Sequence, residues 1–176
     1  MTPPIIICRH QSTNIIRPDA SSYHTFFFDP VTNKPLRGET HQGFSDDSSW
    51  ARGQSWAVYG LALCYHYTKE KSIFAVVLNG LRIIFIDHLP EDSVPYWDLI
   101  FSDGSDEPRD TSAAVVAVCG ILEMEKYYHN QEFLDAAEKM MTSLSEKYTT
   151  VDYPQSNGII KDGMYSRKHG HEPECT

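Results

Sequence analysis

Apolar positions recur at helical spacing in four separate segments of the chain. These segments run over about residues 49–67, 72–88, 110–129 and 132–148. The tail that starts at about residue 151 lacks this spacing and is typical of a loop. The pattern therefore predicts an all-α fold built from two successive helical hairpins.

The second helix of each predicted hairpin is amphipathic. In the segment 72–88 the apolar face carries Ile73, Val76, Val77, Leu81 and Ile84. In the segment 132–148 the inward face is expected to carry Phe133, Ala137, Met140, Met141, Leu144 and Tyr148. The segment 110–129 is almost wholly small and apolar through its first half, which favours an inner helix covered by the amphipathic one.

Two other elements are predicted before the first hairpin. Residues 4–16 have the pattern of a helix tail, which Arg17 and Pro18 bring to an end. Residues 21–29 form an extended, aromatic piece that turns at residues 29–35. This hairpin-like excursion of about 25 residues is longer than a connector needs, and long ordered loops often carry function.

The chain contains an internal repeat. When it is shifted by 63 positions, residues 47–49 (DSS) match 110–112 (DTS), and residues 65–67 (YHY) match 128–130 (YHN). Chance similarity of short patterns is the alternative explanation. As a true repeat it predicts a ring or solenoid of helical hairpins, in which two hairpins are too few to close a ring.

Composition bounds the class of protein. A length of 176 residues with 41% hydrophobic and 22% charged residues indicates one globular domain over residues 1–176. A net charge of −9 argues against nucleic acid and against an anionic membrane surface as partners. Since Cys64 and Cys119 lie in apolar helical runs, free buried thiols are favoured over a disulfide. We therefore expect a reducing, cytoplasmic location, and the oligomeric state stays open.

The most unusual stretch is residues 40–56, THQGFSDDSSWARGQSW. Asp46, Asp47 and Ser48 precede the first predicted helix, where they would serve as N-terminal caps. Arg52 and Trp56 stand four positions apart and share one helix face. They are either a structural arginine beside a core tryptophan, or an arginine that holds a carboxylate while the indole stacks on a sugar ring.

Further polar groups flank that helix. His41 and Gln42 come immediately before it, and His24 lies in the preceding extended piece. A small basic cluster in the tail is either a solvated tail or part of the same site; it contains Tyr165, Ser166, Arg167 and Lys168. The sequence contains no HExxH, GxSxG, Walker A or GxGxxG motif, so it does not support a metalloprotease, an α/β-hydrolase or a nucleotide-binding protein.

These residues coincide with the motifs of a known family. The segment YHTFFFDPVTNKPLRGETHQGFSDDSSWARGQSWAVYGLA closely resembles the unsaturated glucuronyl hydrolases, glycoside hydrolase family 88. Its marks are Tyr-His in a strand, then Thr-His-Gln-Gly, then Ser-x-Trp-x-Arg-Gly-Gln-x-Trp. DTSAAVVAVCGILEM and NGIIKDGMYSRK resemble later family segments, so the likeness runs from about Cys8 to Cys175.

The resemblance implies a fold, a reaction and a set of contacts. The fold is an (α/α)6 barrel, a six-hairpin toroid of which this chain holds about half. The reaction hydrates the C4–C5 double bond of an unsaturated uronic acid at the end of a disaccharide or oligosaccharide, and the resemblance implies that it requires no metal or organic cofactor. His24, His41, Gln42 and Arg52 match substrate-contacting positions, and Trp56 matches a stacking position. Ser166, Arg167 and Lys168 match positions where members tune recognition of a sulfated neighbouring sugar.

The family's two catalytic aspartates find no match in this chain. In the family they lie upstream of the Tyr-His strand, where this sequence offers only Asp19. Asp46 and Asp47 are poor replacements, because the start of a helix lowers the pKa of a carboxyl while a general acid needs a raised one. We therefore expect a C-terminal portion of such an enzyme that keeps its substrate-binding residues.

Three alternatives remain from the sequence. The first is a related hydrolase of unsaturated rhamnogalacturonan, which the Thr-His-Gln-Gly block disfavours. The second is a sugar-binding module without activity. The third is a non-functional truncated reading frame whose half barrel exposes helix faces and aggregates.

Overall fold

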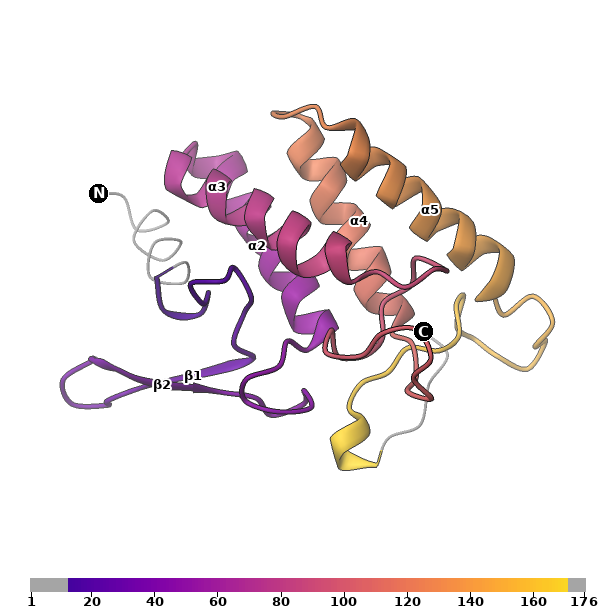
Figure 1. Cartoon of the computed structure of the whole chain (residues 1–176), viewed down its shortest axis with the longest axis horizontal. Coiled ribbons are helices and arrows are strands. Elements are labelled where there is room, and N and C mark those ends of the chain that lie inside the picture. Colours follow the sequence, from indigo (N-terminus) through magenta and orange to yellow (C-terminus); the bar gives the residue numbers. More distant parts are fainter. Residues whose placement is uncertain (1–12, 171–176) are drawn as a thin grey trace.

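The computed structural model describes residues 13–170, apart from the side chains of Ile83, Ile84 and Lys168. A two-stranded sheet comes first, and helical hairpins follow it (Figure 1). The predicted helix tail at residues 4–16 falls mostly outside the described residues. The first helical hairpin pairs α2 (Ala51–Thr68) with α3 (Lys71–Asn79), and the second pairs α4 (Thr111–Glu125) with α5 (Gln131–Lys147).

The predicted hairpin-like excursion is confirmed. Strand β1 (Thr25–Phe28) pairs antiparallel with β2 (Pro35–Glu39), with Thr25 opposite Glu39 and a bulge beside Phe28. Figure 1 shows this sheet extending away from the helical body. Gly38 is required in β2, because a Cβ there would collide with the ring of Tyr23.

The helix predicted over 72–88 changes its winding along its length. After α3 the chain continues as a π-helical segment, η1 (Gly80–Phe85), and a short 3₁₀ turn, η2 (Ile86–His88). The wider π winding begins at Gly80, where a Cβ would stand 3.2 Å from the side-chain amide of Gln54. The apolar face of α3 continues into the π-helical segment, where Leu81 and Phe85 are both fully buried.

The inner helices α2 and α4 pack directly against each other through small side chains. Ala113, Ala114 and Ala117 on α4 and Ala51 on α2 are all fully buried. A Cβ at Gly120 would lie 2.9 Å from a methyl group of Val58 and 3.4 Å from the backbone of Tyr59. The two helix axes can therefore approach closely, while α3 covers α2 and α5 covers α4.

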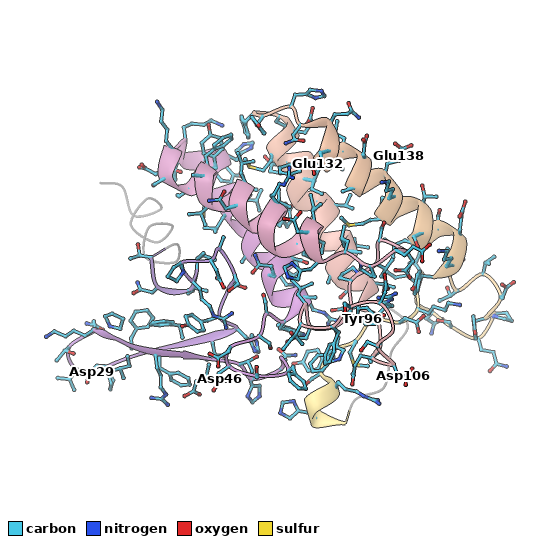
Figure 2. The ribbon with its side chains drawn as sticks, in the orientation of Figure 1. Asp29, Asp46, Tyr96, Asp106, Glu132 and Glu138 are labelled. Atoms are coloured by element: carbon cyan, nitrogen blue, oxygen red, sulfur yellow. The ribbon has the colours of Figure 1, made fainter. Side chains whose placement is uncertain are left out.

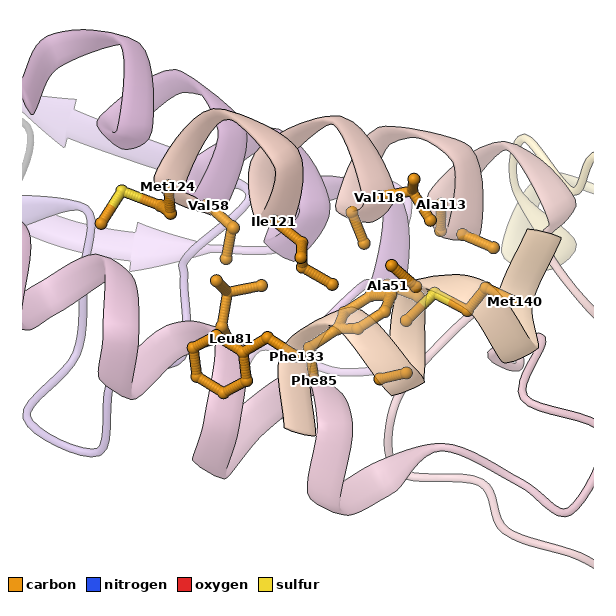
Figure 3. Close-up of a cluster of buried hydrophobic side chains, with 14 of the residues drawn as sticks. Ala51, Val58, Leu81, Phe85, Ala113, Val118, Ile121, Met124, Phe133 and Met140 are labelled. Atoms are coloured by element: carbon orange, nitrogen blue, oxygen red, sulfur yellow. The ribbon is translucent and has the colours of Figure 1, made fainter. Parts of the chain in front are cut away.

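Larger apolar side chains fill the space between the inner pair and the outer helices. Figure 3 shows Leu81 and Phe85 from one outer segment and Phe133 and Met140 from α5 meeting Ile121 of α4. The inward face predicted for α5 is confirmed except at Met141, which is 47% exposed while Ala136 is buried instead. The buried face of α5 therefore extends toward Ala136 rather than toward Met141, a rotation of well under a quarter of a helical turn.

The prediction that Asp46, Asp47 and Ser48 cap the first inner helix is wrong. Trp50 occupies the N-cap position of α2 and makes no side-chain cap, and the first turn of α2 carries no acidic residue. The Ala51 amide instead donates to the carbonyl of Trp97, at 3.0 Å. A loop from a distant part of the chain therefore caps α2, which local sequence cannot indicate.

The two cysteines of the helical runs differ from their predicted state. Cys119 is a free thiol but is exposed, and Cys64 is disulfide-bonded. The prediction of free buried thiols is therefore wrong for Cys64, whereas for Cys119 the free thiol is confirmed and its burial is wrong. Among residues 13–170, no helix is long and apolar enough to cross a membrane.

Candidate functional site

The N-terminal ends of α2 and α4 lie side by side, and three loops close around them. The loop of residues 95–99 joins both helix starts: Leu99 donates its amide to Ser49 and Asp110 donates its amide to Pro95, at 2.9 and 2.8 Å. The tail reaches the same place, since the Thr111 amide donates to Asp162 at 3.1 Å. Figure 2 shows Asp46, Tyr96 and Asp106 at this end, whereas Glu132 and Glu138 lie along α5.

A buried ion pair joins the two inner helices at this end. Arg52 of α2 donates through Nε and one Nη to the two carboxylate oxygens of Asp110, at 3.0 and 2.9 Å. The Asp110 side chain is fully buried and that of Arg52 is 17% exposed. Asp110 also accepts from the hydroxyl of Ser112 at 2.7 Å and from the amide of Met164 at 3.3 Å.

This pair changes the interpretation of both residues. Asp110 stands at the N-cap of α4, as the repeat predicted, but it makes no side-chain cap and orients Arg52 instead. The Nη1 of Arg52 makes no hydrogen bond within residues 13–170. A guanidinium held on one edge by a carboxylate can present its remaining N–H groups in a fixed direction.

His24 holds the loop that carries the other predicted donors. Its Nδ1 accepts hydrogen bonds from the backbone amides of His41 and Gln42, at 3.0 and 3.1 Å. Its ring also lies 4.6 Å from the indole of Trp50, centroid to centroid. Burial lowers the pKa of His24 below its ordinary value, and the neighbouring His41 lowers it further.

The tail closes over the same loop. Gln42 is buried and donates its side-chain amide to the carbonyl of Tyr165, at 3.2 Å. Ser166, which is fully buried, lies 3.4 Å from the carbonyl of Gln42 and 2.7 Å from Nδ1 of His169. The rings of His41 and His169 are 5.0 Å apart. Residues more than 120 positions apart in the sequence thus form one wall.

Trp56 lies apart from this group. It is 55% exposed, its ring is 6.3 Å from that of Tyr59, and it lines a small apolar pocket of about 140 Å³ with Ile15 and Ile16. It shares the α2 face with Arg52, one turn further from the helix start. The structure brings together His24, His41 and Gln42, places Arg52 beside them through Trp50, and leaves Trp56 outside.

The basic cluster predicted in the tail divides. Ser166 is buried in the wall described above, whereas Arg167 lies at the surface with its Nε 4.0 Å from a carboxylate oxygen of Glu107. Ser166 is the N-cap of the short 3₁₀ turn η3 (Arg167–His169), and Arg167 is its first residue. The side chain of Lys168 lies outside the described part of the chain.

Several residues shape the site through contacts that the sequence did not indicate. Trp50 lies between His24 and Arg52: its ring faces that of His24 and is 5.9 Å from the guanidinium carbon of Arg52. Tyr165 lies at the same distance from that carbon. His169 and Asp110 are the others. The alignment of residues 47–49 with 110–112 was a signal for Asp110, but no local pattern indicates the contacts of a tail residue.

Asp98 is the other fully buried carboxyl near the loop. It accepts from the amide of Phe44 at 2.9 Å and from the hydroxyl of Ser48 at 2.7 Å. Burial raises its pKa, and these hydrogen bonds oppose the shift. Because its oxygens are already hydrogen-bonded beneath the loop of residues 44–48, Asp98 fits a structural role.

The site is a cationic and amide-rich wall. Its donors are the guanidinium of Arg52, imidazole groups and the Gln42 amide, which suit a carboxylate and sugar hydroxyls. Within residues 13–170, no three His, Cys, Asp or Glu side chains come together in a way that could hold a metal ion. The described residues thus offer recognition of a polar anion, without a metal-binding cluster.

Comparison with known proteins places the chain among a group of hydrolases. The model of Glycosyl Hydrolase Family 88 matches residues 13–174. Curated relatives include the "Unsaturated chondroitin disaccharide hydrolase" of Streptococcus pneumoniae, 46% identical over 90% of this chain, and the "Unsaturated glucuronyl hydrolase" of Bacillus sp., 38% identical over 91%. They are covered over 41% and 44% of their own lengths.

A solved structure agrees with these relatives. The crystal structure of unsaturated glucuronyl hydrolase from Streptococcus agalactiae superposes with a TM-score of 0.86 at 42% identity. The match covers 94% of this chain and 43% of that one. The helical hairpins described above therefore have the fold of the corresponding part of an α/α barrel, and the chain spans about two fifths of the length of the proteins it matches.

Proposed function

Because the chain belongs to glycoside hydrolase family 88, we propose that it carries the uronate-binding wall of a hydrolase that acts on unsaturated glucuronyl disaccharides and oligosaccharides. The observation that carries the proposal is the clamped Arg52, whose guanidinium is fixed by the buried Asp110 at 2.9 and 3.0 Å. A fixed cation beside amide and imidazole donors suits the carboxylate and hydroxyls of a uronic acid. The names of the relatives support this class of substrate.

The proposed architecture is a partial ring. The two hairpins, α2 with α3 and α4 with α5, would be two of the six in an (α/α)6 barrel. Their inner helices would line its centre. The exposed Trp56 would then face the substrate cavity from α2, where an indole can stack on a sugar ring.

The proposed reaction adds water across the C4–C5 double bond. A carboxylic acid protonates the vinyl ether, water adds at C5, and the hemiketal that results opens and releases the partner sugar. Arg52, His24, His41 and Gln42 would orient the uronate and stabilise charge on its carboxylate during this step. The chemistry asks for no metal or organic cofactor.

The proton donor would come from outside the described residues. Asp110 is fully buried and both of its carboxylate oxygens are hydrogen-bonded to Arg52, so it has no access to the substrate. Asp98 has a raised pKa but is fully buried, with its oxygens hydrogen-bonded. A general acid needs both a proton and access to the substrate, and neither carboxyl combines the two.

Calorimetry with an unsaturated chondroitin disaccharide tests the binding part of this proposal. We expect the 176-residue chain to bind the disaccharide. Arg52→Ala should weaken binding about tenfold or more, because it removes one charged hydrogen-bond donor to the uronate. Arg82→Ala is the matched control, because Arg82 pairs with Glu132 on the outer surface. No binding by the native chain, or equal losses in both variants, would refute the proposal.

A second measurement tests the reaction. The absorbance of the conjugated double bond decreases when the uronide is hydrated. We expect turnover by the isolated chain to be very slow or absent. Robust turnover would show that an acid of this chain serves as the proton donor after all.

A further inference from the structure

The hydrogen bonds of His24 determine where its proton lies. Its Nδ1 accepts from two backbone amides at once, those of His41 and Gln42. A ring nitrogen that accepts a hydrogen bond carries no proton, so the neutral ring must be protonated at Nε2. Adding a second proton would turn an N–H toward two other N–H groups and break both bonds.

The surroundings of His24 oppose a positive charge as well. The titratable group that faces it most directly is His41, with ring centroids 6.3 Å apart, and His169 lies beyond His41. On the α2 side the neutral ring of Trp50 separates it from Arg52, which is itself a cation. Asp110 is committed to Arg52. No carboxylate therefore pairs with His24 among the contacts described.

We propose that His24 is a positioning residue that holds the loop of His41 and Gln42 through its unprotonated Nδ1, so that the site keeps its binding geometry only while His24 is neutral. Its Nε2–H remains available as a donor to the ligand. The proposal rests on the proposed function for the identity of that ligand. The hydrogen bonds that hold the loop stand on the geometry of this chain alone.

This role decides the direction of the pH effect. If His24 merely attracted the uronate by charge, affinity would increase as the pH falls and the ring becomes cationic. A ring that positions the loop gives the opposite result, because protonation releases the two amides. The lowered pKa of His24 agrees with the positioning role. Neutral His24 contributes its full stabilisation of the folded chain above pH 6.5, the ordinary pKa of histidine, and this stabilisation is lost as the pH falls through the lowered pKa of the folded state.

Nuclear magnetic resonance of the ¹⁵N-labelled 176-residue chain tests the proton's position without any ligand. Two-bond couplings in the imidazole distinguish a protonated from an unprotonated nitrogen. At pH 6.5, where an ordinary histidine is half protonated, we expect His24 to be mostly neutral with its proton on Nε2. A proton on Nδ1, or a ring half charged at that pH, would overturn the proposal.

Amide hydrogen exchange then tests the positioning of the loop. As His24 titrates, the amides of residues 41 and 42 should lose protection. The Ser22 amide is the control, because it donates to the side chain of Gln54 at 2.8 Å and to no histidine. Unchanged protection of residues 41 and 42 across the titration of His24 contradicts the role.

A variant separates the two jobs of the ring. In His24→Asn the side-chain oxygen can take the acceptor position of Nδ1 and gains no proton in this range. The amides should then stay protected at acid pH while the donor to the ligand is lost. If this variant does not fold, the titration of the native chain still decides.

Calorimetry with the unsaturated chondroitin disaccharide links the loop to binding. We expect affinity to fall at least threefold between pH 7 and a pH at which the resonances show His24 to be charged. Tighter binding at the lower pH would overturn the positioning role. Absence of binding at every pH would refute the proposed function instead, and the resonance and exchange results would then judge the positioning role by themselves.

Discussion

Replacing Asp110 with asparagine probes the ion pair that joins the inner helices. The substitution keeps the shape of the side chain but removes its charge. One carboxylate oxygen becomes an NH₂ group, which would face an N–H of Arg52 as donor against donor. The variant therefore leaves a guanidinium that is 17% exposed without its counter-charge.

The burial of the pair sets the size of the effect. Breaking a buried ion pair from one side costs about 3–5 kcal/mol, and the partial exposure of Arg52 favours the lower end, about 3 kcal/mol. Two further donors, the Ser112 hydroxyl and the Met164 amide, keep an acceptor only if the remaining oxygen faces them. We expect the free energy of unfolding of Asp110→Asn to fall by about 3 kcal/mol.

Urea denaturation followed by far-ultraviolet circular dichroism measures this loss. With a denaturant slope of about 2 kcal/mol/M, the midpoint should fall by about 1.5 M. Glu132→Gln is the matched control, since its partner Arg82 and Glu132 itself are 50% and 47% exposed. Loss of such a surface pair should cost less than about 1 kcal/mol.

A double variant isolates the interaction itself. In Arg52→Met/Asp110→Asn no cation remains to be stranded, so the second change should cost far less than it does alone. We expect a coupling of at least about 1.5 kcal/mol between the two positions. Additive losses, or an Asp110→Asn variant as stable as the Glu132→Gln control, would refute the view that this pair couples the inner helices.

Three shorter predictions concern other parts of the structure. Gly120→Val should lower the free energy of unfolding by about 1–3 kcal/mol in urea denaturation, because its Cβ would lie 2.9 Å from Val58. The control is Gly60→Ala, whose Cβ meets nothing within 4 Å and which should be neutral or stabilising. Equal changes in stability in the two variants would contradict the close packing of α2 and α4. Trp56→Ala should change stability by less than about 1 kcal/mol yet weaken disaccharide binding about fivefold in calorimetry, and unchanged affinity would remove Trp56 from the site. Tyr148→Phe should cost about 1–2 kcal/mol by the same denaturation, through loss of its 2.7 Å hydrogen bond to Asp92, and an unchanged midpoint would show that this bond contributes nothing net.

The helices could be predicted because each one's own residues carry the signal. The first inner helix was expected over 49–67 and spans 51–68, and the last was expected over 132–148 and spans 131–147. The helix ends could not be predicted in the same way. The first amide of α2 donates to the carbonyl of Trp97, nearly fifty positions away. Because this loop caps the helix, the polar residues just before α2 make other contacts, although their sequence is typical of N-terminal caps.

The convergence of three candidate residues could be predicted for the same reason. His41, Gln42 and Arg52 lie close in sequence, so one helix start brings them near each other. Motif spacing did not indicate what holds them, because Asp110 and Tyr165 approach from other hairpins and from the tail. Trp56 shares a helix face with Arg52, but a turn of helix separates it from the wall that the loops build.

The packing of the inner helices and the geometry of the site depend on each other. Small residues let α2 and α4 approach until Gly120 touches Val58, and this separation determines whether Asp110 can reach both N–H groups of Arg52. A bulky residue at Gly120 would therefore push the helices apart and strain the ion pair, although it lies more than two turns along α4 from Asp110. Stability and ligand affinity should fall together in Gly120→Val, whereas Trp56→Ala should separate them.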